Sequence, residues 1–215
     1  VLGGDGDPDN DISSSSVVYA DARVDNCVNN GDISITANTY TTTGWMYIGG
    51  VAGYICAEAG VDPVVSGNTN LNAVVWNDGS NGAKVRPFIG GVAGYAVAGE
   101  FTENVNAATL TVAKKMYDLD WGGVLGAANV TIARCKNEGT LEIAQELTTG
   151  HIGGVLGRLE KSTGTTPSSL LDCDNYGKLL LEDGFYIKQS CNVGAVCDCH
   201  FSLRSENKTI YLRIL

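Results

Sequence analysis

The sequence repeats one short phrase at long intervals: a hydrophobic residue, two glycines, valine, a variable residue and glycine. It reads IGGVAG from Ile48 and from Ile89, WGGVLG from Trp121 and IGGVLG from Ile152, and a degenerate copy, VGAVCD, begins at Val193. The first glycines of successive copies are 41, 32, 31 and 41 residues apart. A repeat of this length is typical of stacked structural units, and it constrains the fold more than any other feature.

A second phrase accompanies the first. It reads CVNNGDISI from Cys27, CKNEGTLEI from Cys135 and CDNYGKLLL from Cys173, with looser copies NVNAATLTV from Asn104 and VWNDGS from Val75. Asn-x-Gly is typical of a turn, because asparagine bonds to the local backbone and glycine adopts positive φ at no steric cost. The apolar residues that follow alternate with polar ones, which predicts a strand with one buried face. We align the shared asparagines as Asn29, Asn77, Asn106, Asn137 and Asn175.

We interpret the glycine phrase as the next strand. Its glycines leave room for close backbone approach, and its valines are expected to point inward. A phosphate-binding loop would need a helix directly after the glycines and an acidic residue about 20 residues later; Tyr54 and Ile55 follow the first copy instead. The glycines are therefore expected to be scaffold: Gly49, Gly50, Gly90, Gly91, Gly122, Gly123, Gly153 and Gly154. The inward valines are Val51, Val92, Val124, Val155 and Val196.

Together the two phrases resemble the GLUG-type repeats of bacterial surface and secreted proteins, which are common in gut Bacteroidales. The resemblance covers residues 24 to 198 and rests on the order of the glycine phrase and the C-x-N-x-G phrase. It implies a repeat architecture and a location outside the cell. Such repeats also occur beside the catalytic region of certain bacterial immunoglobulin proteases. This sequence has no H-E-x-x-H zinc motif, so no catalytic residue is carried over.

The predicted fold is an all-β repeat solenoid of about five units, with a right-handed parallel β-helix as the preferred form. Residues 1–16 are expected to be a flexible acidic and serine-rich leader, and residues 17–215 a single domain ending in a capping strand at 209–215. The variable connections are expected at 36–47, 57–70, 113–120, 144–150 and 158–170. The alternative is a β-sandwich or β-prism of repeated short-strand units, which would show similar spacing.

Charge and hydropathy limit the partners. The net charge is −10, and the 14 lysines and arginines form no cluster, which argues against nucleic acid and against anionic membranes. No apolar run reaches 18 residues, so no transmembrane helix is expected. We expect an extracellular protein or one held at the bacterial outer membrane, with any lipid anchor outside this sequence.

Candidate metal ligands are few, and no cofactor is expected. Asp5, Asp7, Asp9 and Asp11 alternate as the oxygen ligands of calcium loops do, but Ser16 stands where an EF-hand has its bidentate glutamate. A solvated leader is the preferred interpretation. A metal cluster formed by Cys191, Cys197, Cys199 and His200 is disfavoured, because Cys-x-Cys lacks the usual zinc spacing.

Two further repeat positions bear on reactivity. Cys27, Cys135 and Cys173 share one position with Asn104 and Val75, which suggests buried, free cysteines that behave as small hydrophobic residues. His151 shares another with Tyr47, Phe88, Asp120 and Asn192, which favours a solvent-facing position rather than a general base. Trp121 replaces isoleucine in the glycine phrase and is expected in the core. The acids Glu100, Glu103, Asp118 and Asp120 show no pairing that the sequence can establish.

The sequence favours a non-catalytic surface module, adhesin-like, that binds glycan or a host protein. Tyr40, Trp45 and Tyr47 in a connection, and Trp76 at an outward position, are the candidate ligand-binding residues, because aromatic faces stack on sugar rings. A structural spacer or assembly subunit that makes contacts through the solenoid ends is the competing class. A carbohydrate-active β-helix enzyme is a second alternative, which would require paired carboxylates.

Overall fold

The computed structural model describes residues 22–36, 44–57, 62–77, 85–160, 168–182, 185 and 187–197. These residues form strands β1 to β24 and no helix. In this part of the chain, no helix has the length and apolarity needed to cross a membrane. The expected leader, Asp5, Asp7, Asp9, Asp11, Cys199, His200 and the capping strand lie outside the described residues.

The strands stack into five sheets, which we call A to E in chain order. Sheet A contains β1 (Arg23–Asp25), β6 (Val64–Ser66), β11 (Glu100–Thr102), β16 (Thr131–Ala133) and β21 (Ser169–Leu171). Sheet B contains β2 (Val28–Asn29), β7 (Thr69–Asn70), β12 (Val105–Asn106), β17 (Lys136–Asn137) and β22 (Asp174–Asn175). Sheet C contains β3 (Ile33–Ile35), β8 (Val74–Trp76), β13 (Leu110–Val112), β18 (Thr140–Ile143) and β23 (Lys178–Leu181). Sheet D contains β4 (Gly44–Gly49), β9 (Val85–Gly90), β14 (Met116–Gly122), β19 (Leu147–Gly153) and β24 (Ile187–Gly194). Sheet E contains β5 (Ala52–Ile55), β10 (Ala93–Ala96), β15 (Leu125–Ala128) and β20 (Leu156–Leu159).

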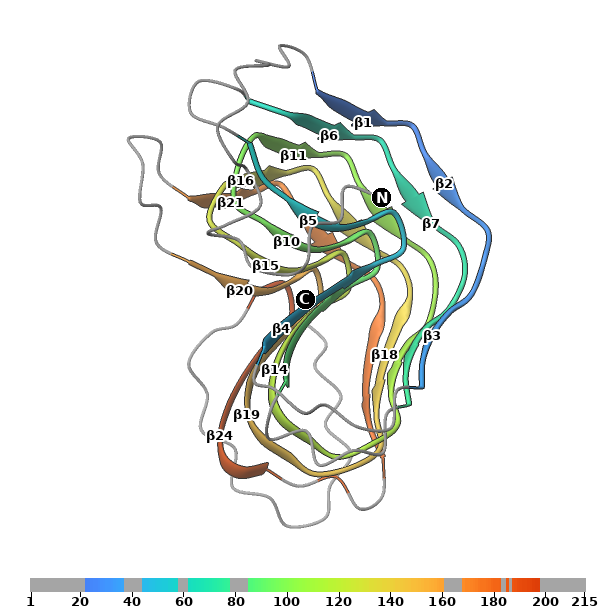
Figure 1. The fold of residues 1–215 in the computed structure, drawn as a ribbon, viewed down its shortest axis with the longest axis vertical. Coiled ribbons are helices and arrows are strands. Elements are labelled where there is room, and N and C mark those ends of the chain that lie inside the picture. The colour runs from blue at the N-terminus through green and yellow to red at the C-terminus, as the bar shows by residue number, and fades with distance from the viewer. Residues whose placement is uncertain are drawn as a thin grey trace.

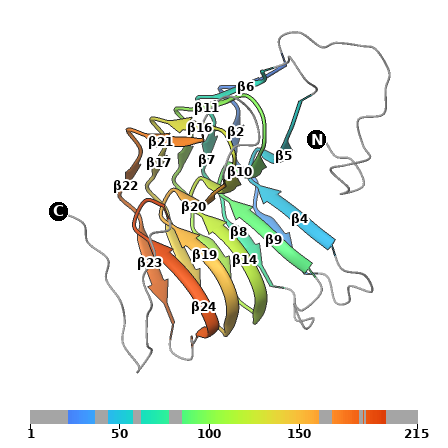
Figure 2. The same ribbon diagram turned by 90° about the vertical axis from the view of Figure 1, so that its left-hand side faces the viewer.

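Five consecutive strands complete one coil, and each strand pairs with the strand five positions later (Figures 1 and 2). Coils 1 to 4 contain β1–β5, β6–β10, β11–β15 and β16–β20; coil 5 contains β21–β24, and a bridge from Leu156 to Cys197 continues sheet E. Every pairing is parallel. The expected solenoid of five units is confirmed, and the sandwich alternative, which needs antiparallel strands, is not supported. The right-handed sense of the coil stays a prediction.

The coil differs in detail from the expectation. Each full coil has five short strands rather than two, and parts of the expected connections are strands: residues 57–70 include β6 and β7, and residues 113–120 include most of β14. The chain between strands varies in length at two places, from sheet C to sheet D and from sheet E to sheet A. Changes in coil length are therefore confined to two corners, and the stacked strands keep their register except for one shift between β19 and β24, between Leu147 and Thr149.

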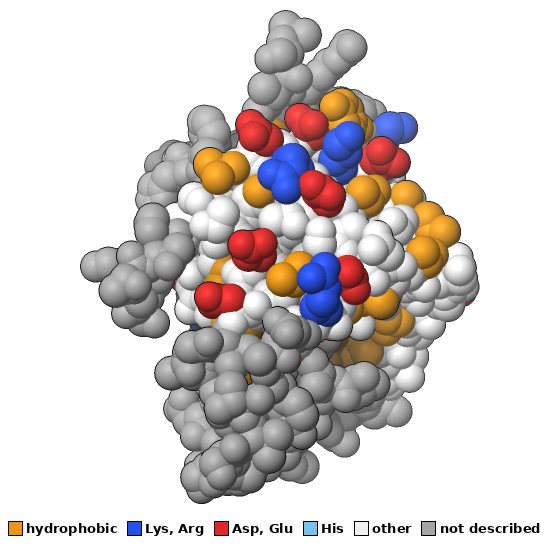
Figure 3. Space-filling model, turned by 90° about the horizontal axis from the view of Figure 1, so that it is seen from above, with side chains coloured by type: hydrophobic (Ala, Val, Ile, Leu, Met, Phe, Trp, Pro, Cys, Tyr) orange, Lys and Arg blue, Asp and Glu red, His pale blue; other side chains and the backbone are white. Residues whose placement is uncertain are grey.

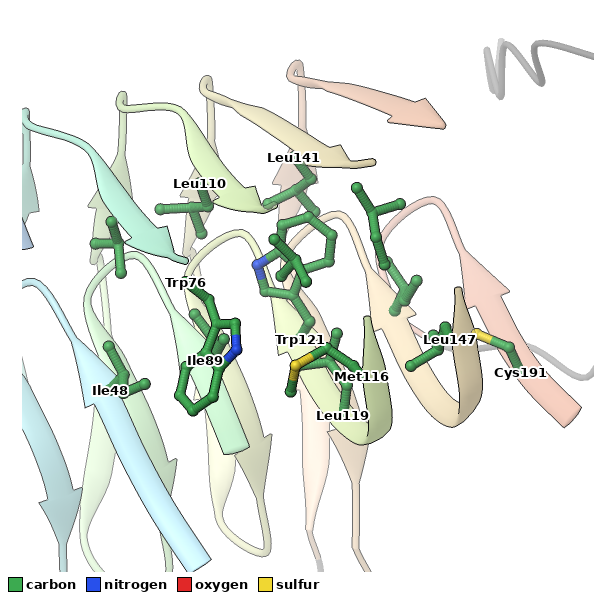
Figure 4. Packing of buried hydrophobic residues seen from close by; sticks show 14 of the residues in the cluster. Ile48, Trp76, Ile89, Leu110, Met116, Leu119, Trp121, Leu141, Leu147 and Cys191 are labelled. Carbon is green, nitrogen blue, oxygen red and sulfur yellow. The ribbon is translucent and has the colours of Figure 1, made fainter. Parts of the chain in front are cut away.

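Two apolar clusters form the core. The first lies between sheets C and D and includes Trp76, Met116 and Trp121 (Figure 4). The second lies between sheets A and E and includes Phe101 and Ile132. Trp121 is fully buried, as expected. Each coil adds only a few side chains to either cluster, so burial, at about 25 cal/mol per Å² of apolar surface, requires stacking.

The glycine phrase forms the corner between sheets D and E rather than one strand. Its first two residues end the sheet D strand, and the valine lies in the turn before the sheet E strand. Val92, Val124 and Val155 are fully buried, and each donates its N–H to the carbonyl of the valine in the next coil at 2.9 Å. Val51 and Val196 are partly buried against the same cluster. The predicted inward valine ladder is confirmed.

The asparagines also form a ladder, but with one different member. Its members are joined by side-chain hydrogen bonds from Nδ2 to the next Oδ1 of 2.7, 2.9, 2.9 and 2.8 Å. In coil 2 the ladder residue is Asn70, so the assignment of Asn77 is wrong. Asn77 follows β8, whereas the copy that aligns with the other four is NTNLNAVVW from Asn68. The asparagine ladder is Asn29, Asn70, Asn106, Asn137 and Asn175.

With Asn70 as the ladder residue of coil 2, asparagine rather than valine shares the position of the three cysteines. The equivalent residues are Cys27, Asn68, Asn104, Cys135 and Cys173, which we call the mixed ladder. Asn104 Oδ1 accepts the N–H of Asn68 at 3.0 Å, and its Nδ2 donates to the carbonyl of Val65 at 2.9 Å. Cys173 Sγ likewise accepts the N–H of Cys135 at 3.3 Å. Cys135 is buried in the second apolar cluster and Cys173 packs against it, but the position also forms hydrogen bonds, so the assignment to a small hydrophobic residue is incomplete.

The three cysteines also differ in burial. Cys135 is buried, Cys173 is half-buried and Cys27, in coil 1, is exposed. The expectation that all three are buried therefore holds for Cys135 alone. Coil 1 has no earlier coil among the described residues to cover its ladder residue, and this leaves Cys27 open to solvent.

Positive φ occurs at one position of every coil, and most of the residues there are not glycine. The residue before each mixed-ladder position adopts φ of 50° to 66°, and only one of the five is glycine: Asn26, Gly67, Glu103, Arg134 and Asp172. Gly139 of the Asn-x-Gly turn is not among the positive-φ glycines, so that part of the turn prediction is wrong. The predicted local bonding by Asn137 is confirmed, because Asn137 Oδ1 accepts the N–H of Gly139 at 3.3 Å. A Cβ on Gly139 would instead overlap the carbonyl of Ala108.

Candidate functional site

The outer faces of sheets D and E meet at a re-entrant corner of the coil (Figure 1). Three stacked rows of outward side chains line it, and we call them together the corner surface. The first row on sheet D is Trp45, Arg86, Asp118, Thr149 and Ser190. The second row on sheet D is Tyr47, Phe88, Asp120, His151 and Asn192. The row on sheet E is Tyr54, Tyr95, Ala127 and Arg158.

The last glycine of the repeated phrase brings these rows together. A Cβ on Gly126 would lie 2.7 Å from the backbone nitrogen of Ile89, and one on Gly157 would lie 2.6 Å from that of Trp121. Because no side chain intervenes, the strands of sheet E pack against the backbone of sheet D. The residue after each glycine therefore stands beside the second row of sheet D.

Aromatic rings occupy the corner surface in coils 1 and 2. Tyr47 lies 4.8 Å from Tyr54 and 5.1 Å from Phe88, and Phe88 lies 5.1 Å from Tyr95, measured between ring centroids. The Tyr95 hydroxyl donates to Glu160 Oε2 at 2.5 Å. Burial of the phenol, together with the hydrogen bond to Glu160, raises the pKa of Tyr95. Tyr95 therefore stays a neutral hydrogen-bond donor at any physiological pH.

Charged side chains from coils 2, 3 and 4 surround Asp120 on the same surface. The Asp120 side chain is fully buried, and its carboxylate contacts Arg86 Nη2 at 2.9 Å, Arg158 Nη2 at 3.1 Å and His151 Nδ1 at 2.7 Å. Arg86 also pairs with Asp118 at 3.2 Å, and Arg158 pairs with Glu160. Asp120 cannot touch a ligand, but it orients three side chains that can.

Phe88 connects the aromatic and charged halves. Its ring is 3% exposed, with the Arg86 guanidinium 5.3 Å and the Arg158 guanidinium 5.8 Å from its centroid. Both distances are within the range of cation–π attraction. The aromatic cluster and the Asp120 network therefore form one continuous arrangement rather than two adjacent ones.

The outer face of sheet A carries exposed ion pairs. On the face shown in Figure 3, acidic and basic side chains lie side by side in the region of sheet A. The pairs there are exposed, with Arg23 and Asp25 3.0 Å apart and Arg134 and Glu103 2.9 Å apart. Exposed pairs of this kind contribute little to stability.

Of the four residues predicted to bind a ligand, the three that the structure describes lie in different environments. Trp45 is 53% exposed on the corner surface, and Tyr47 lies within its aromatic cluster. Trp76 is 2% exposed in the core, so its expected outward position is wrong; within β8 it is Val75 that lies between the two buried positions. Tyr40 lies outside the described residues.

Sequence reasoning missed most of the charged half. His151 is about 25% exposed on its side chain and bonded to Asp120, so the expectation of a simple solvent-facing position is incomplete. Asp118 and Asp120, which were expected in loops, lie on β14. The repeat register aligned Phe88, Asp120 and His151 but could not show that Arg86 and Arg158 reach the same carboxylate. Among the described residues, no group of three or more potential ligands is arranged for a metal ion.

Comparisons of this chain with protein-family models, with curated proteins and with solved structures find no match.

Proposed function

We propose that this chain is a non-catalytic binding module of a bacterial surface protein and that the corner surface binds glycan. The observation that carries the proposal is the continuity of the aromatic cluster with the Asp120 network on one re-entrant face. A pyranose ring has an apolar face and a rim of hydroxyls. Aromatic rings match the face, and the partly exposed Arg86, His151 and Asp118 match the hydroxyls.

The spacing of the rows supports a chain-like ligand. Equivalent residues of neighbouring coils in parallel sheets are about 4.8 Å apart. This distance is close to the length of one pyranose unit, so a glycan lying along the solenoid axis would place successive sugars over successive coils. Trp45, Tyr47 and Tyr54 in the first coil would stack on the sugar rings. Polar side chains in the coils that follow would bind the sugar hydroxyls.

The state of the carboxylates supports a binding role over a catalytic one. A glycosidase needs two carboxyl groups that reach the substrate, one of them free to donate a proton. Asp120 is buried beneath two arginines and a histidine, and Glu160 is held by Arg158 and Tyr95. These two acids hold neighbouring side chains of the corner surface in place.

The cellular context belongs to the same proposal. The repeated phrases resemble those of GLUG-type surface and secreted proteins, and the acidic composition suits a protein that avoids nucleic acid and anionic membranes. We therefore place the module on the outside of a bacterial cell, where a glycan or a glycosylated host protein is its partner.

A glycan array followed by calorimetry tests this proposal. We expect specific binding that Trp45→Ala weakens about tenfold, which corresponds to about 1.4 kcal/mol. Tyr176→Ala is the matched control, because Tyr176 is a more exposed aromatic side chain, at 68%, beyond β22 on the opposite side of the coil. Equal losses in both variants, or no binding at all, would contradict the proposal.

Two further measurements separate the alternatives. Concentration-dependent assembly in sedimentation, without glycan binding, would favour a structural spacer that makes contacts through the solenoid ends. Release of new reducing ends from a bound polysaccharide would favour a carbohydrate-active enzyme. Either result would replace the binding proposal.

A further inference from the structure

Two cysteines stand next to each other in the stack. Cys135 in coil 4 and Cys173 in coil 5 occupy successive positions of the mixed ladder, directly before the paired residues Lys136 and Asp174. The Cys135 N–H donates to Cys173 Sγ at 3.3 Å. Neighbouring parallel strands are about 4.8 Å apart, which is within the range of Cα separations that a disulfide spans.

The two thiols have different reactivity. Cys173 is half-buried, between the exposed side chains of Asp172 and Asp174, and Cys135 is fully buried behind it. The neighbouring Cys135 side chain and the hydrogen bond from the Cys135 N–H lower the pKa of Cys173 to about 7, against the opposing effect of burial. The neighbouring Cys173 side chain, together with burial, raises the pKa of Cys135. Cys173 is therefore the nucleophile that solvent reaches, and Cys135 is the group placed to react second.

We propose that Cys135 and Cys173 form a thiol-modification site that reacts with a low-molecular-weight disulfide and closes into a disulfide between coils 4 and 5. In the first step the Cys173 thiolate attacks one sulfur of the small disulfide, which forms a mixed disulfide and releases one small thiolate. In the second step Cys135 attacks Cys173 Sγ and gives its proton to the departing small thiolate, which leaves as the second small thiol. The two protein thiols lose two electrons, and the small disulfide gains them.

The same ladder contains an internal control. Cys27 occupies the equivalent position in coil 1, is exposed and has Asn68 as its ladder neighbour. A mixed disulfide at Cys27 has no ladder thiol to resolve it. The proposal therefore predicts that one reagent gives different products at two equivalent positions of one chain.

Treatment of the native protein with oxidised glutathione, followed by non-reducing peptide mapping, tests this difference. We expect a peptide cross-linked between Cys135 and Cys173, glutathione retained on Cys27, and a higher melting temperature because a 38-residue loop is closed. Glutathione that stays on Cys173, or the absence of reaction at both cysteines of the pair, would overturn the proposal.

A variant completes the test. Cys135→Asn places at this position the residue that the ladder already carries at Asn68 and Asn104, and it should leave Cys173 trapped as the mixed disulfide with glutathione. Iodoacetamide at pH 7 should also label Cys173 of the untreated protein several-fold faster than the more exposed Cys27. Equal or slower labelling of Cys173 would contradict its assigned role, and this measurement needs no variant.

Discussion

The backbone of Gly123 packs directly against the side chain of Asn137 in the next coil. A Cβ on Gly123 would lie 2.6 Å from Asn137 Oδ1 and would overlap the carbonyl of Gly154. The same contact joins Gly50 to Asn70, Gly91 to Asn106 and Gly154 to Asn175. The coil is therefore narrow between its two apolar clusters, where the second glycine of one phrase contacts the asparagine of the other; we call this contact the waist. The two phrases repeat with the same period because their residues meet there.

The first prediction concerns the waist. Gly123→Ala should lower the free energy of unfolding by about 2–3 kcal/mol, because the added methyl group meets backbone and an asparagine fixed in a ladder. Urea denaturation measures this change. Gly44→Ala is the control: it lies in β4, where a Cβ would have no atom within 4 Å, and it should be neutral or slightly stabilising. Equal effects at the two sites would show that close approach does not explain the repeated glycines.

The second prediction concerns the Asp120 network. Asp120→Asn should lower the free energy of unfolding by about 3 kcal/mol or more, because two guanidinium groups and His151 lose the carboxylate that they share in a buried setting. Glu103→Gln removes one partner of an exposed pair with Arg134 and should change stability by no more than about 0.5 kcal/mol. A small change in the free energy of unfolding of Asp120→Asn would mean that water replaces the carboxylate as the partner of the two arginines.

The third prediction concerns the residues with positive φ. Asp172 has a φ of 50°, and Asp172→Gly should raise the free energy of unfolding by about 0.5 kcal/mol, because glycine removes the steric cost of this conformation. Asp174→Gly, two residues later in β22, should instead lower it by a similar amount. Thermal unfolding measures the stability of both variants. A stability change of the same sign in the two variants would contradict the prediction.

The fourth prediction concerns the mixed ladder. Asn104→Leu should lower the free energy of unfolding by about 3 kcal/mol, because the Asn68 N–H loses its acceptor and the Val65 carbonyl loses its donor. Asn104→Cys should cost clearly less, since Cys173 Sγ accepts an equivalent N–H in the native chain. If leucine were tolerated better than cysteine, the position would be apolar after all, as the sequence first suggested.

The degenerate fifth glycine phrase lacks the second glycine. In coils 1 to 4 the second glycine meets an asparagine of the following coil, and in coil 5 this position is Ala195. The described residues end at Cys197, and none of them forms a sixth coil. Among the described residues, the second glycine of the phrase is therefore present at the four positions where it meets an asparagine of the following coil.

The features that recur once per coil could be predicted from the amino-acid sequence. The solenoid, its five coils, the inward valines, the buried Trp121 and the turn bonding of Asn137 all depend on local spacing or on a residue type that recurs once per coil. Each coil cannot bury its apolar side chains alone, so a repeat of this kind leaves stacking as the stable arrangement.

The contacts between residues of different coils could be identified only in the folded chain. Two asparagines in coil 2 fit the phrase, and Asn70 rather than Asn77 is joined to its neighbours, because membership depends on a side-chain contact in space. Arg86 reaches Asp120 across 34 residues, while Arg158 comes from another sheet. The Arg86 contact joins neighbouring strands of sheet D, whereas the Arg158 contact requires the re-entrant corner, which exists because glycines let the strands of sheet E approach the backbone of sheet D. The sequence shows the glycines, but the angle they allow, and the side chains that it brings together, follow from the packing of the whole coil.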